Sequence, residues 1–241
     1  MKPLIVIPAR YESSRFPGKP LVDIAGKSML MRVWERCVSV LGVEGVVVAT
    51  DDQRIVDHCD EIGMRSSMTP SSCLTGTDRI AFVAKQLKAD IYINVQGDEP
   101  LIQPDDIQAV IDHALKSPEK IFNAYAMTYD EVDYFSPNIP KIVTRPDGRL
   151  LYASRSPVPG AKRVAFDCAA RQVCIYAFPY DALLAFSSCA EKTYLEDKED
   201  IEILRFLELG YEVWMVEVSN KGIAVDTPED LSRVLAILER K

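Results

Sequence analysis

The chain has 241 residues, of which 48% are hydrophobic and 27% are charged, a composition typical of a globular protein with a packed core. This composition excludes a disordered chain, a collagen-like fibre and a coiled coil, and no run of about eighteen apolar residues that could span a membrane occurs. The net charge of −8, from 28 basic and 36 acidic residues, argues against nucleic-acid binding, because such proteins usually carry a basic surplus.

The N-terminal sequence MKPLIVIPAR contains only a short apolar stretch and no cleavage site of small residues, so it does not resemble a signal peptide. None of the six cysteines forms a CxxC pair, and the two histidines, His58 and His113, lie in polar segments. We therefore expect no zinc site, histidines at the surface, and reduced thiols in a cytoplasmic protein.

Strands and helices are expected to alternate over the first half of the chain. Apolar runs rich in branched residues predict buried strands, and apolar positions at helical spacing predict helices between them. The strands are expected at about 3–9, 45–50 and 90–95, and the helices at about 29–37, 52–62, 80–87 and 104–115. This alternation is typical of an α/β fold whose mostly parallel sheet is covered on both faces.

Polar loops directly follow these strands or precede the helices. They are residues 10–19, Asp51, residues 76–79 and Asp98. Because ligands of such folds bind beyond the carboxyl ends of the strands, we expect these loops to share one rim of the sheet.

The second half of the chain predicts an antiparallel arrangement. Strands are expected in FNAYAMTY, in PKIVTRPDGRLLYASRS with PDG as the hairpin turn, in RQVCIYAF and in YEVWMVEV. An acidic amphipathic helix is expected at 195–209, and a C-terminal helix is expected to begin at Thr227 as its N-cap. We interpret residues 1–241 as one domain, with a first half of about 1–120 and an inserted sheet lobe of about 121–215.

The loop RYESSRFPGKP gathers Arg10, Arg15 and Lys19 with Ser13. Three cations and exposed backbone N–H groups beside a helix start would hold a polyphosphate. The loop matches neither GxxxxGK[ST] nor GxGxxG, so it is neither of these two common phosphate-binding motifs. A solvated basic loop is the alternative interpretation.

Two acids follow strands in similar motifs, Asp98 in NVQGDEP and Asp226 in VDTPEDL. At one rim they could share Mg²⁺, whose other oxygen ligands would come from substrate phosphates, or each could simply cap the next turn. In TGTDR, Gly76, Thr77 and Arg79 suit close approach to a ligand, but the motif fits a plain helix N-terminus equally well.

Together, the motifs RYESSRFPGKPL, ATDD, GTDR, NVQGDEP, PNxxKxV and VDTPEDL resemble the 3-deoxy-manno-octulosonate cytidylyltransferases, in order from residue 4 to residue 238. More widely, they resemble the nucleotidyltransferases that activate sugars. The resemblance implies a Rossmann-like, GT-A-like nucleotidyltransferase fold whose mostly parallel sheet carries an inserted antiparallel lobe. It also implies that CTP and a 3-deoxy-octulosonic sugar acid give a CMP-sugar and diphosphate with Mg²⁺, for lipopolysaccharide biosynthesis, in a homodimer formed through the lobe.

The resemblance further assigns roles to residues of this chain. Arg10, Arg15 and Lys19 would bind the triphosphate and act with Asp98 in catalysis, while Asp98 and Asp226 would hold Mg²⁺. The residues expected around the nucleotide are Pro8, Ala9, Arg10, Ser13, Lys19, Ser72, Gly76, Thr77, Arg79 and Gln96. The residues expected around the sugar acid are Gln96, Lys141, Arg155, Arg171, Gln172, Tyr176, Glu199 and Glu202.

This chain departs from the family pattern near the sugar acid. Gln172 replaces the histidine of an arginine–histidine pair, Cys174 replaces a glycine, and the segment YLEDKEDIEIL carries additional acids. Glu199 and Glu202, at i and i+3, would share a helix face and either accept bonds from the sugar or be solvated. The added carboxylates would suit a substrate with a positive group, such as the 8-amino-8-deoxy form of the sugar acid.

Two alternatives stay open. The substrate could be another nonulosonic acid, as in the CMP-sialate synthetases. The chain could also be a catalytically inactive nucleotide-binding subunit, but such a protein is expected to lose the phosphate loop or the metal acids. This chain keeps Arg10, Arg15, Lys19, Asp98 and Asp226.

Overall fold

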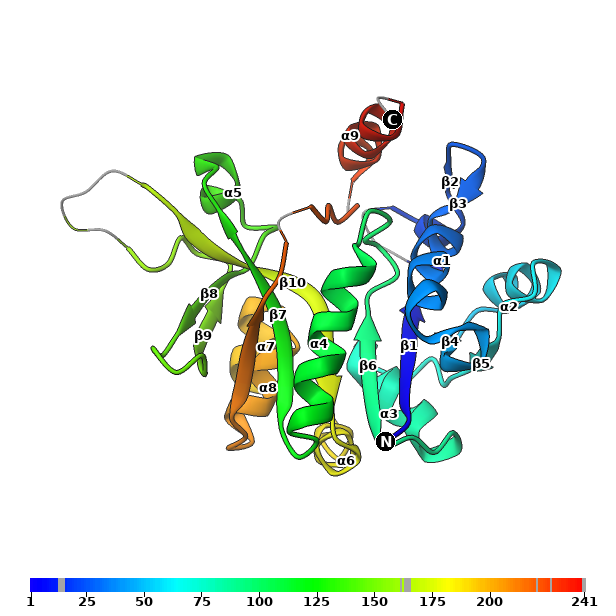
Figure 1. Ribbon diagram of the computed structural model, residues 1–241, viewed down its shortest axis with the longest axis horizontal. Coiled ribbons are helices and arrows are strands. Elements are labelled where there is room, and N and C mark those ends of the chain that lie inside the picture. Colours follow the sequence, from blue (N-terminus) through cyan, green and yellow to red (C-terminus); the bar gives the residue numbers. More distant parts are fainter. Residues whose placement is uncertain (13–15, 161, 163–165, 220, 226, 240–241) are drawn as a thin grey trace.

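One mixed sheet organises the computed structural model, which describes residues 1–12, 16–160, 162, 166–219, 221–225 and 227–239 (Figure 1). Within these residues the sheet has nine strands. They are β1 (Pro3–Ala9), β4 (Val46–Thr50), β5 (Ser66–Met68), β6 (Ile91–Val95), β7 (Ile121–Thr128), β8 (Lys141–Thr144), β9 (Leu150–Ser154), β10 (Ala169–Phe178) and β11 (Val213–Glu217). A separate small hairpin joins β2 (Asp23–Ile24) to β3 (Lys27–Ser28).

The helices connect these strands in chain order. They are α1 (Met29–Leu41), α2 (Gln53–Glu61), α3 (Gly76–Gln86), α4 (Pro104–Lys116), α5 (Glu131–Phe135), α6 (Tyr180–Phe186), α7 (Tyr194–Glu199), α8 (Ile203–Glu208) and α9 (Pro228–Leu238). Short 3-10 turns lie at Lys19–Leu21 and Val43–Gly45.

The main path of the sheet runs in the order β11-β7-β10-β6-β1-β4-β5. Along it β10 is antiparallel to both of its neighbours, while the other pairs are parallel. The expected α/β fold with a mostly parallel sheet is therefore confirmed. Its parallel strands end at one common edge, which is where ligands bind in folds of this kind.

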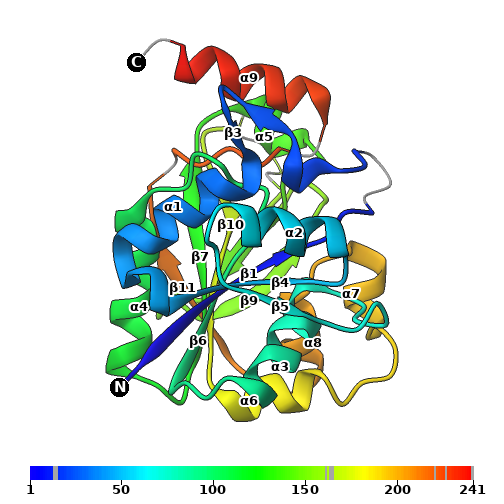
Figure 2. The same cartoon turned by 90° about the vertical axis from the view of Figure 1, so that its right-hand side faces the viewer.

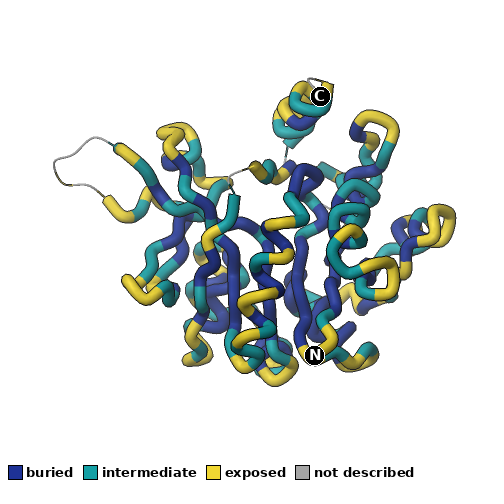
Figure 3. Tube along the Cα trace, in the orientation of Figure 1, coloured by how far each residue is buried: buried dark blue, intermediate teal, exposed yellow. Residues whose placement is uncertain are grey.

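Both faces of the sheet are buried. Ile5 and Ile7 of β1 point into the core beneath α1 and α4, and Leu4 and Val6 point into a second core beneath α3 and α6. Alternate side chains of a strand face opposite sides, so a strand covered on both sides is apolar throughout, as PLIVIPA is. Figure 3 shows the strands as a dark blue interior under a mixed surface.

The antiparallel extension is a hairpin of β8 and β9 that pairs with the first residues of β10. Gly148, in the expected PDG turn, has a φ of 87°, which only glycine adopts without strain. Since β7, β10 and β11 belong to the main sheet, the expected lobe at 121–215 shares its sheet with the first half of the chain.

The prediction of one continuous acidic helix at 195–209 is wrong. The segment forms two short helices, α7 and α8, because Asp200 adopts a left-handed conformation with a φ of 50°. Glu199 and Glu202 therefore do not share a helix face, and their carboxylates bind different partners.

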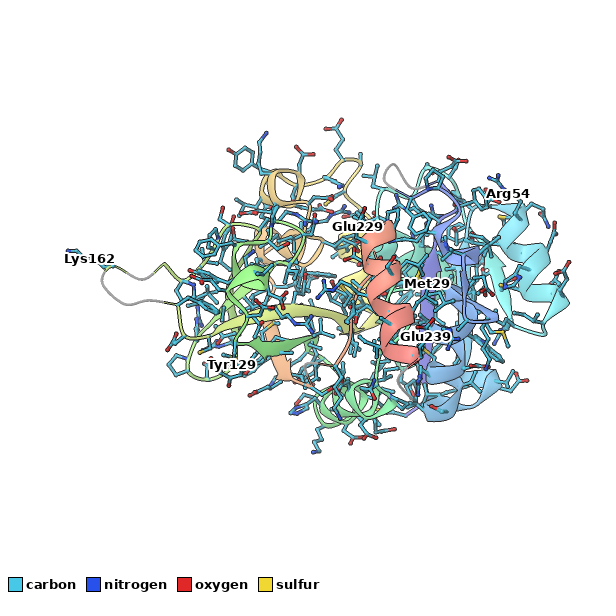
Figure 4. The ribbon with its side chains drawn as sticks, turned by 90° about the horizontal axis from the view of Figure 1, so that it is seen from above. Met29, Arg54, Tyr129, Lys162, Glu229 and Glu239 are labelled. Atoms are coloured by element: carbon cyan, nitrogen blue, oxygen red, sulfur yellow. The ribbon has the colours of Figure 1, made fainter. Side chains whose placement is uncertain are left out.

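The C-terminal helix α9 begins as predicted. Thr227 is its N-cap, and the Thr227 hydroxyl and the Asp230 carboxylate form a capping box. From above, α9 lies between the two halves of the molecule, with Glu229 and Glu239 near its ends (Figure 4).

Helices of membrane-spanning length and apolarity do not occur among the described residues. All six cysteines are free thiols, of which Cys37 and Cys59 are buried. Among the described residues, neither histidine belongs to a group of side chains that could hold a metal ion. The His58 ring forms a 2.8 Å hydrogen bond with the Ser28 hydroxyl.

Candidate active site

Two cavities open at the carboxyl edge of β1 and β6. The first cavity, of about 370 Å³, lies between the end of β1, Lys19 and the start of α3. The second cavity, of about 430 Å³, lies against β10 and the segments 136–140 and 222–224. Both are lined by Gln96, Asp98, Asp200 and Glu202, so the two cavities meet there.

The first cavity gathers several of the predicted nucleotide residues. Lys19 Nζ donates to Asp98 Oδ2 at 2.9 Å, and Arg10 Nη2 donates to the carbonyl of Cys73 at 3.3 Å. The predicted residues that line this cavity are Pro8, Ala9, Arg10, Lys19, Gly76 and Gln96. Ser13 and Arg15 lie outside the described residues.

The TGTDR motif forms the first turn of α3. Thr75 is the N-cap, and its hydroxyl and the Asp78 carboxylate form a capping box. A Cβ on Gly76 would lie 3.1 Å from Gln96 Nε2 and 3.2 Å from Pro8 Cγ. Glycine therefore favours the close approach of α3 to Pro8 of β1 and to Gln96, which follows β6, because a Cβ would push on these neighbours.

The Glu202 carboxylate occupies the N-terminus of α3. It accepts hydrogen bonds from the Gly76 N–H at 3.0 Å, the Thr77 N–H at 2.9 Å and the Thr77 hydroxyl at 2.6 Å. The helix dipole favours a negative charge at this position. Thr77, expected at the nucleotide, and Glu202, expected at the sugar acid, thus bind each other.

Arg79 and Ser72 do not line either cavity. The Arg79 guanidinium is 1% exposed and donates to the Thr69 hydroxyl and the Asp51 carboxylate, both at 2.6 Å. It therefore braces the loops below the first cavity. Ser72 is exposed in the turn before α3.

The second cavity contains the guanidinium groups expected for a sugar acid. Arg155 Nη1 donates to the Pro137 carbonyl at 2.9 Å, and Arg155 Nη2 donates to the Asp200 carbonyl at 2.8 Å. Arg171 Nη2 donates to the Gly222 carbonyl at 3.1 Å. The predicted residues that line this cavity are Gln96, Arg155, Arg171, Gln172, Tyr176 and Glu202.

Lys141 is not among the lining residues, although it was expected to contact the sugar acid. It is fully buried, and its ammonium donates to the carbonyls of Ser136 and Ile139 at 2.7 Å and of Arg155 at 2.8 Å. Burial lowers the pKa of Lys141, and the nearby Arg155 adds to this effect. Because all three donors are used, Lys141 holds the segments around the cavity and has no donor left for a ligand.

Gln172 is also directed into the sheet. Its Nε2 donates to Asn123 Oδ1 at 2.8 Å, and Asn123 Nδ2 donates to the carbonyls of Val173 and Ile175, both at 3.0 Å. This network fills the place where the register between β10 and β7 shifts. The amide of Gln172 therefore stabilises the irregular strand.

Glu199 faces β9 rather than the cavities. It accepts hydrogen bonds from the Ser154 hydroxyl at 2.8 Å, the Tyr152 hydroxyl at 3.1 Å and the Arg155 N–H at 2.9 Å. Burial raises the pKa of Glu199, but these hydrogen bonds, led by that of the Arg155 N–H, outweigh it and lower the pKa overall.

Glu99 lines the second cavity but is not among the residues predicted for the site. It is 4% exposed and accepts a hydrogen bond from the Cys174 N–H at 3.1 Å. Burial raises the pKa of Glu99 to about 7, and the neighbouring Asp98 adds to this effect. The sequence feature that could have identified Glu99 is its position directly after Asp98 in NVQGDEP.

Lys192 and Asp200 are two further charged residues that sequence reasoning did not place. Lys192 lines the first cavity, and Asp200 lines both. Lys192 Nζ donates to Asp200 Oδ1 at 2.6 Å. Asp200 belongs to the acidic segment YLEDKEDIEIL, and Lys192 precedes this segment by two residues.

Comparison with known proteins identifies the family. A family model described as cytidylyltransferase matches residues 4–215. A 3-deoxy-manno-octulosonate cytidylyltransferase of Syntrophotalea carbinolica is 42% identical over 97% of each chain, and that of Escherichia coli is 38% identical over 100% of this chain and 97% of the other. The chain belongs to the 3-deoxy-manno-octulosonate cytidylyltransferases.

Solved structures agree with this membership. A CMP:2-keto-3-deoxy-manno-octonic acid synthetase complexed with CTP superposes with a TM-score of 0.91, at 37% identity, over 100% of this chain and 99% of the other. HddC from Yersinia pseudotuberculosis, at 17% identity and a TM-score of 0.70 over 99% of this chain and 100% of the other, shares the fold.

The Mg²⁺ expected for a cytidylyltransferase fits the donor chemistry at Asp98. This carboxylate is 27% exposed where the two cavities meet, and carboxylate oxygens are the ligands that Mg²⁺ prefers. Within the described residues no three His, Cys, Asp or Glu side chains form a metal cluster. A site with few protein ligands is typical of Mg²⁺ bound together with substrate phosphates. The second expected ligand, Asp226, lies outside the described residues.

Proposed function

We propose that this chain transfers CMP from CTP to 3-deoxy-manno-octulosonate, or to its 8-amino-8-deoxy form, for lipopolysaccharide biosynthesis. The observation that carries the proposal is the meeting of the two cavities at Gln96 and Asp98. Arg10 and Lys19 line the first cavity and Arg171 lines the second, so cations lie on both sides of this point. Two anionic reactants could thus meet there.

The proposed reaction is an attack of the anomeric hydroxyl of the sugar acid on the α-phosphorus of CTP. The new bond joins this oxygen to phosphorus, the bond from the α-phosphorus to the oxygen of the β-phosphate breaks, and diphosphate leaves. The proton of the hydroxyl is released to solvent. We assign the triphosphate to Arg10 and Lys19, with Arg15 by family resemblance, because cations stabilise the charge of the leaving diphosphate. Positioning the two anions is the main task, so a covalent enzyme intermediate is not required.

We further propose that Asp98, with Asp226, holds Mg²⁺. The ion would supply charge neutralisation at the phosphates of CTP. Lys19 donates a hydrogen bond to the same carboxylate at 2.9 Å, so a cation already lies beside Asp98 where the two cavities meet.

For the nucleoside we propose the backbone of residues 8–10 and the first turn of α3. Pro8, Ala9, Arg10 and Gly76 line the first cavity, and backbone groups near them can read the edge of a pyrimidine. Ser72 and Thr77 were also expected near the nucleoside. Both donors of Thr77 already bind the Glu202 carboxylate, so Thr77 would contact the nucleoside only if one of these hydrogen bonds were shared with it.

For the sugar acid we propose Arg171 as the carboxylate-binding residue, since a guanidinium can form two parallel hydrogen bonds to a carboxylate. The Arg155 side chain already donates to the carbonyls of Pro137, Glu199 and Asp200, and it would support the cavity wall. Among the additional acids of YLEDKEDIEIL, Asp200 and Glu202 line the second cavity. They are the groups that would accept hydrogen bonds from an amine or hydroxyl of the sugar.

We also propose a cytoplasmic homodimer without a nucleic-acid partner. The net charge of −8 disfavours a polyanion as partner. Tyr129, Val132 and Phe135 around α5 and Leu151 of β9 are at least half exposed, as expected of a subunit interface in the lobe.

The test is diphosphate release by purified protein with Mg²⁺ and CTP. The sugar acids are 3-deoxy-manno-octulosonate, its 8-amino-8-deoxy analogue and N-acetylneuraminate, each in a separate reaction, with ATP, GTP and UTP as nucleotide controls. Lys19→Met should lower the rate at least about tenfold, because it removes a cation at the phosphates. Lys85→Met, which replaces an exposed lysine of α3, is the matched control and should retain full activity.

Release with CTP and one of the octulosonates supports the proposal and identifies the sugar acid. Release with N-acetylneuraminate alone moves the substrate to the sialate class. Folded protein that binds CTP but releases no diphosphate in any reaction would overturn the proposal in favour of a nucleotide-binding subunit.

A further inference from the structure

Lys192 is a basic residue of the first cavity that belongs to none of the motifs from which the phosphate site was assigned. It lies between α6 and α7 and lines the cavity together with Arg10 and Lys19, although both precede it by more than 170 residues in the sequence. Figure 2 shows α7 on the side of the molecule toward which β1 runs. A third cation therefore faces the space assigned to the triphosphate.

The residues that directly follow Lys192 are held by hydrogen bonds. Thr193 is the N-cap of α7 and forms a capping box with Glu196. The Glu208 carboxylate accepts hydrogen bonds from the Leu195 N–H at 2.9 Å and the Glu196 N–H at 3.2 Å. The lysine side chain therefore extends from a held position at the cavity wall.

The ammonium of Lys192 is engaged by an exchangeable partner. Its distance to Asp200 Oδ1 is 2.6 Å, with 29% of the lysine side chain and 68% of the aspartate side chain exposed. An ion pair this exposed contributes little to stability, because water screens the charges and ordering long side chains costs entropy. A phosphate offers a lysine several strong acceptor oxygens, so the ammonium can exchange Asp200 for phosphate at small cost.

We propose that Lys192 is a phosphate-binding residue of the first cavity, and that Asp200 holds its ammonium at the cavity until the triphosphate of CTP takes it. This inference rests on the proposed function for the identity of the nucleotide. Asp200 is well placed for the role because Arg155 Nη2 donates to its carbonyl at 2.8 Å, which fixes the turn between α7 and α8. The carboxylate thus competes with phosphate for one cation of the cavity.

The proposal is tested by direct binding of CTP, CMP and cytidine to the full chain, without sugar acid, by calorimetry. Lys192→Met should weaken CTP binding about tenfold, because a charge-assisted hydrogen bond to phosphate is lost. It should leave cytidine binding unchanged, because cytidine has no phosphate and the lost ion pair with Asp200 contributes little to stability. Lys192→Arg should restore most of the affinity. Asp200→Asn should bind CTP as tightly as the wild type or more tightly, because the competing carboxylate is removed. Lys198→Met, at an exposed lysine of α7, is the control and should match the wild type.

Equal CTP affinity in Lys192→Met and the wild type would overturn the inference. Equal weakening of CTP and cytidine, or the same loss in Asp200→Asn as in Lys192→Met, would also overturn it, because both results indicate a structural ion pair. Other results would overturn the proposed function itself. They are wild-type protein that binds CTP no more tightly than ATP, and wild-type protein that binds CTP but releases no diphosphate with any sugar acid.

Discussion

Replacing Lys141 by Met should lower the stability of the fold, and any effect on substrate binding should be secondary to this loss. The buried ammonium donates to three carbonyls, at 2.7, 2.7 and 2.8 Å. Hydrogen bonds with a charged partner contribute about 1.5–3 kcal/mol each, but burial of the charge opposes them, consistent with the lowered pKa of Lys141. We therefore expect a net loss of about 3 kcal/mol from the free energy of unfolding, because methionine would leave these carbonyls without their donor.

Urea unfolding, followed by tryptophan fluorescence, measures this loss as a lower midpoint at constant slope. Lys85→Met, at an exposed lysine of α3, is the control and should stay within about 0.5 kcal/mol of the wild type. The KM for the sugar acid is measured on the same samples below the midpoint. An unchanged midpoint with a raised KM for the sugar acid would refute the reasoning, because Lys141 would then contact the substrate.

Three further predictions follow from the site. Asp98→Asn should lower the rate of diphosphate release at least about a hundredfold at saturating CTP and Mg²⁺. EDTA should abolish diphosphate release by the wild type, and activity that survives EDTA would contradict the metal role of Asp98. Arg171→Lys should raise the KM for the sugar acid about tenfold, since an ammonium cannot form two parallel bonds to a carboxylate, while equilibrium CTP binding stays unchanged; a shift in CTP binding alone would contradict this. Glu199 has a pKa below its usual 4.5, so its stabilising contribution is complete above about pH 4.5 and is lost as pH falls through the lowered pKa. The difference in unfolding free energy between the wild type and Glu199→Gln should therefore shrink on acidification below pH 4.5, and a constant difference would count against hydrogen bonding to the ionised carboxylate as the source of this stability.

Local patterns were sufficient to predict the fold and one side of the site. The run PLIVIPA predicts a strand buried on both faces, and Leu4 and Ile5 do lie in different cores. Loops after such strands must reach the carboxyl edge of the sheet, so the proximity of Arg10 and Asp98 follows from topology. The remaining loop residues, Ser13 and Arg15, stay predictions, as does Asp226.

The sugar side was less predictable because its contacts join distant parts of the chain. Lys141 donates to the carbonyl of Arg155, and Gln172 donates to Asn123, 49 residues away. Spacing rules describe neighbours on one helix, so they placed Glu199 and Glu202 together, whereas the left-handed Asp200 separates them. Each of these side chains is held at least in part by a backbone or side-chain group of another element, and no local pattern encodes such contacts.

One buried cation links the first turns of α3 and α7. Arg205 is fully buried, and its guanidinium donates to Glu196 at 2.5 and 2.6 Å and to Asp78 at 3.1 Å. Asp78 belongs to the capping box of α3, and Glu196 belongs to that of α7. The two helix starts are thus fixed to each other, which brings Glu202 to the N-terminus of α3 and Lys192 to the first cavity. A change at Arg205 should therefore alter both cavities together, whereas a change at Lys192 should be confined to the phosphates.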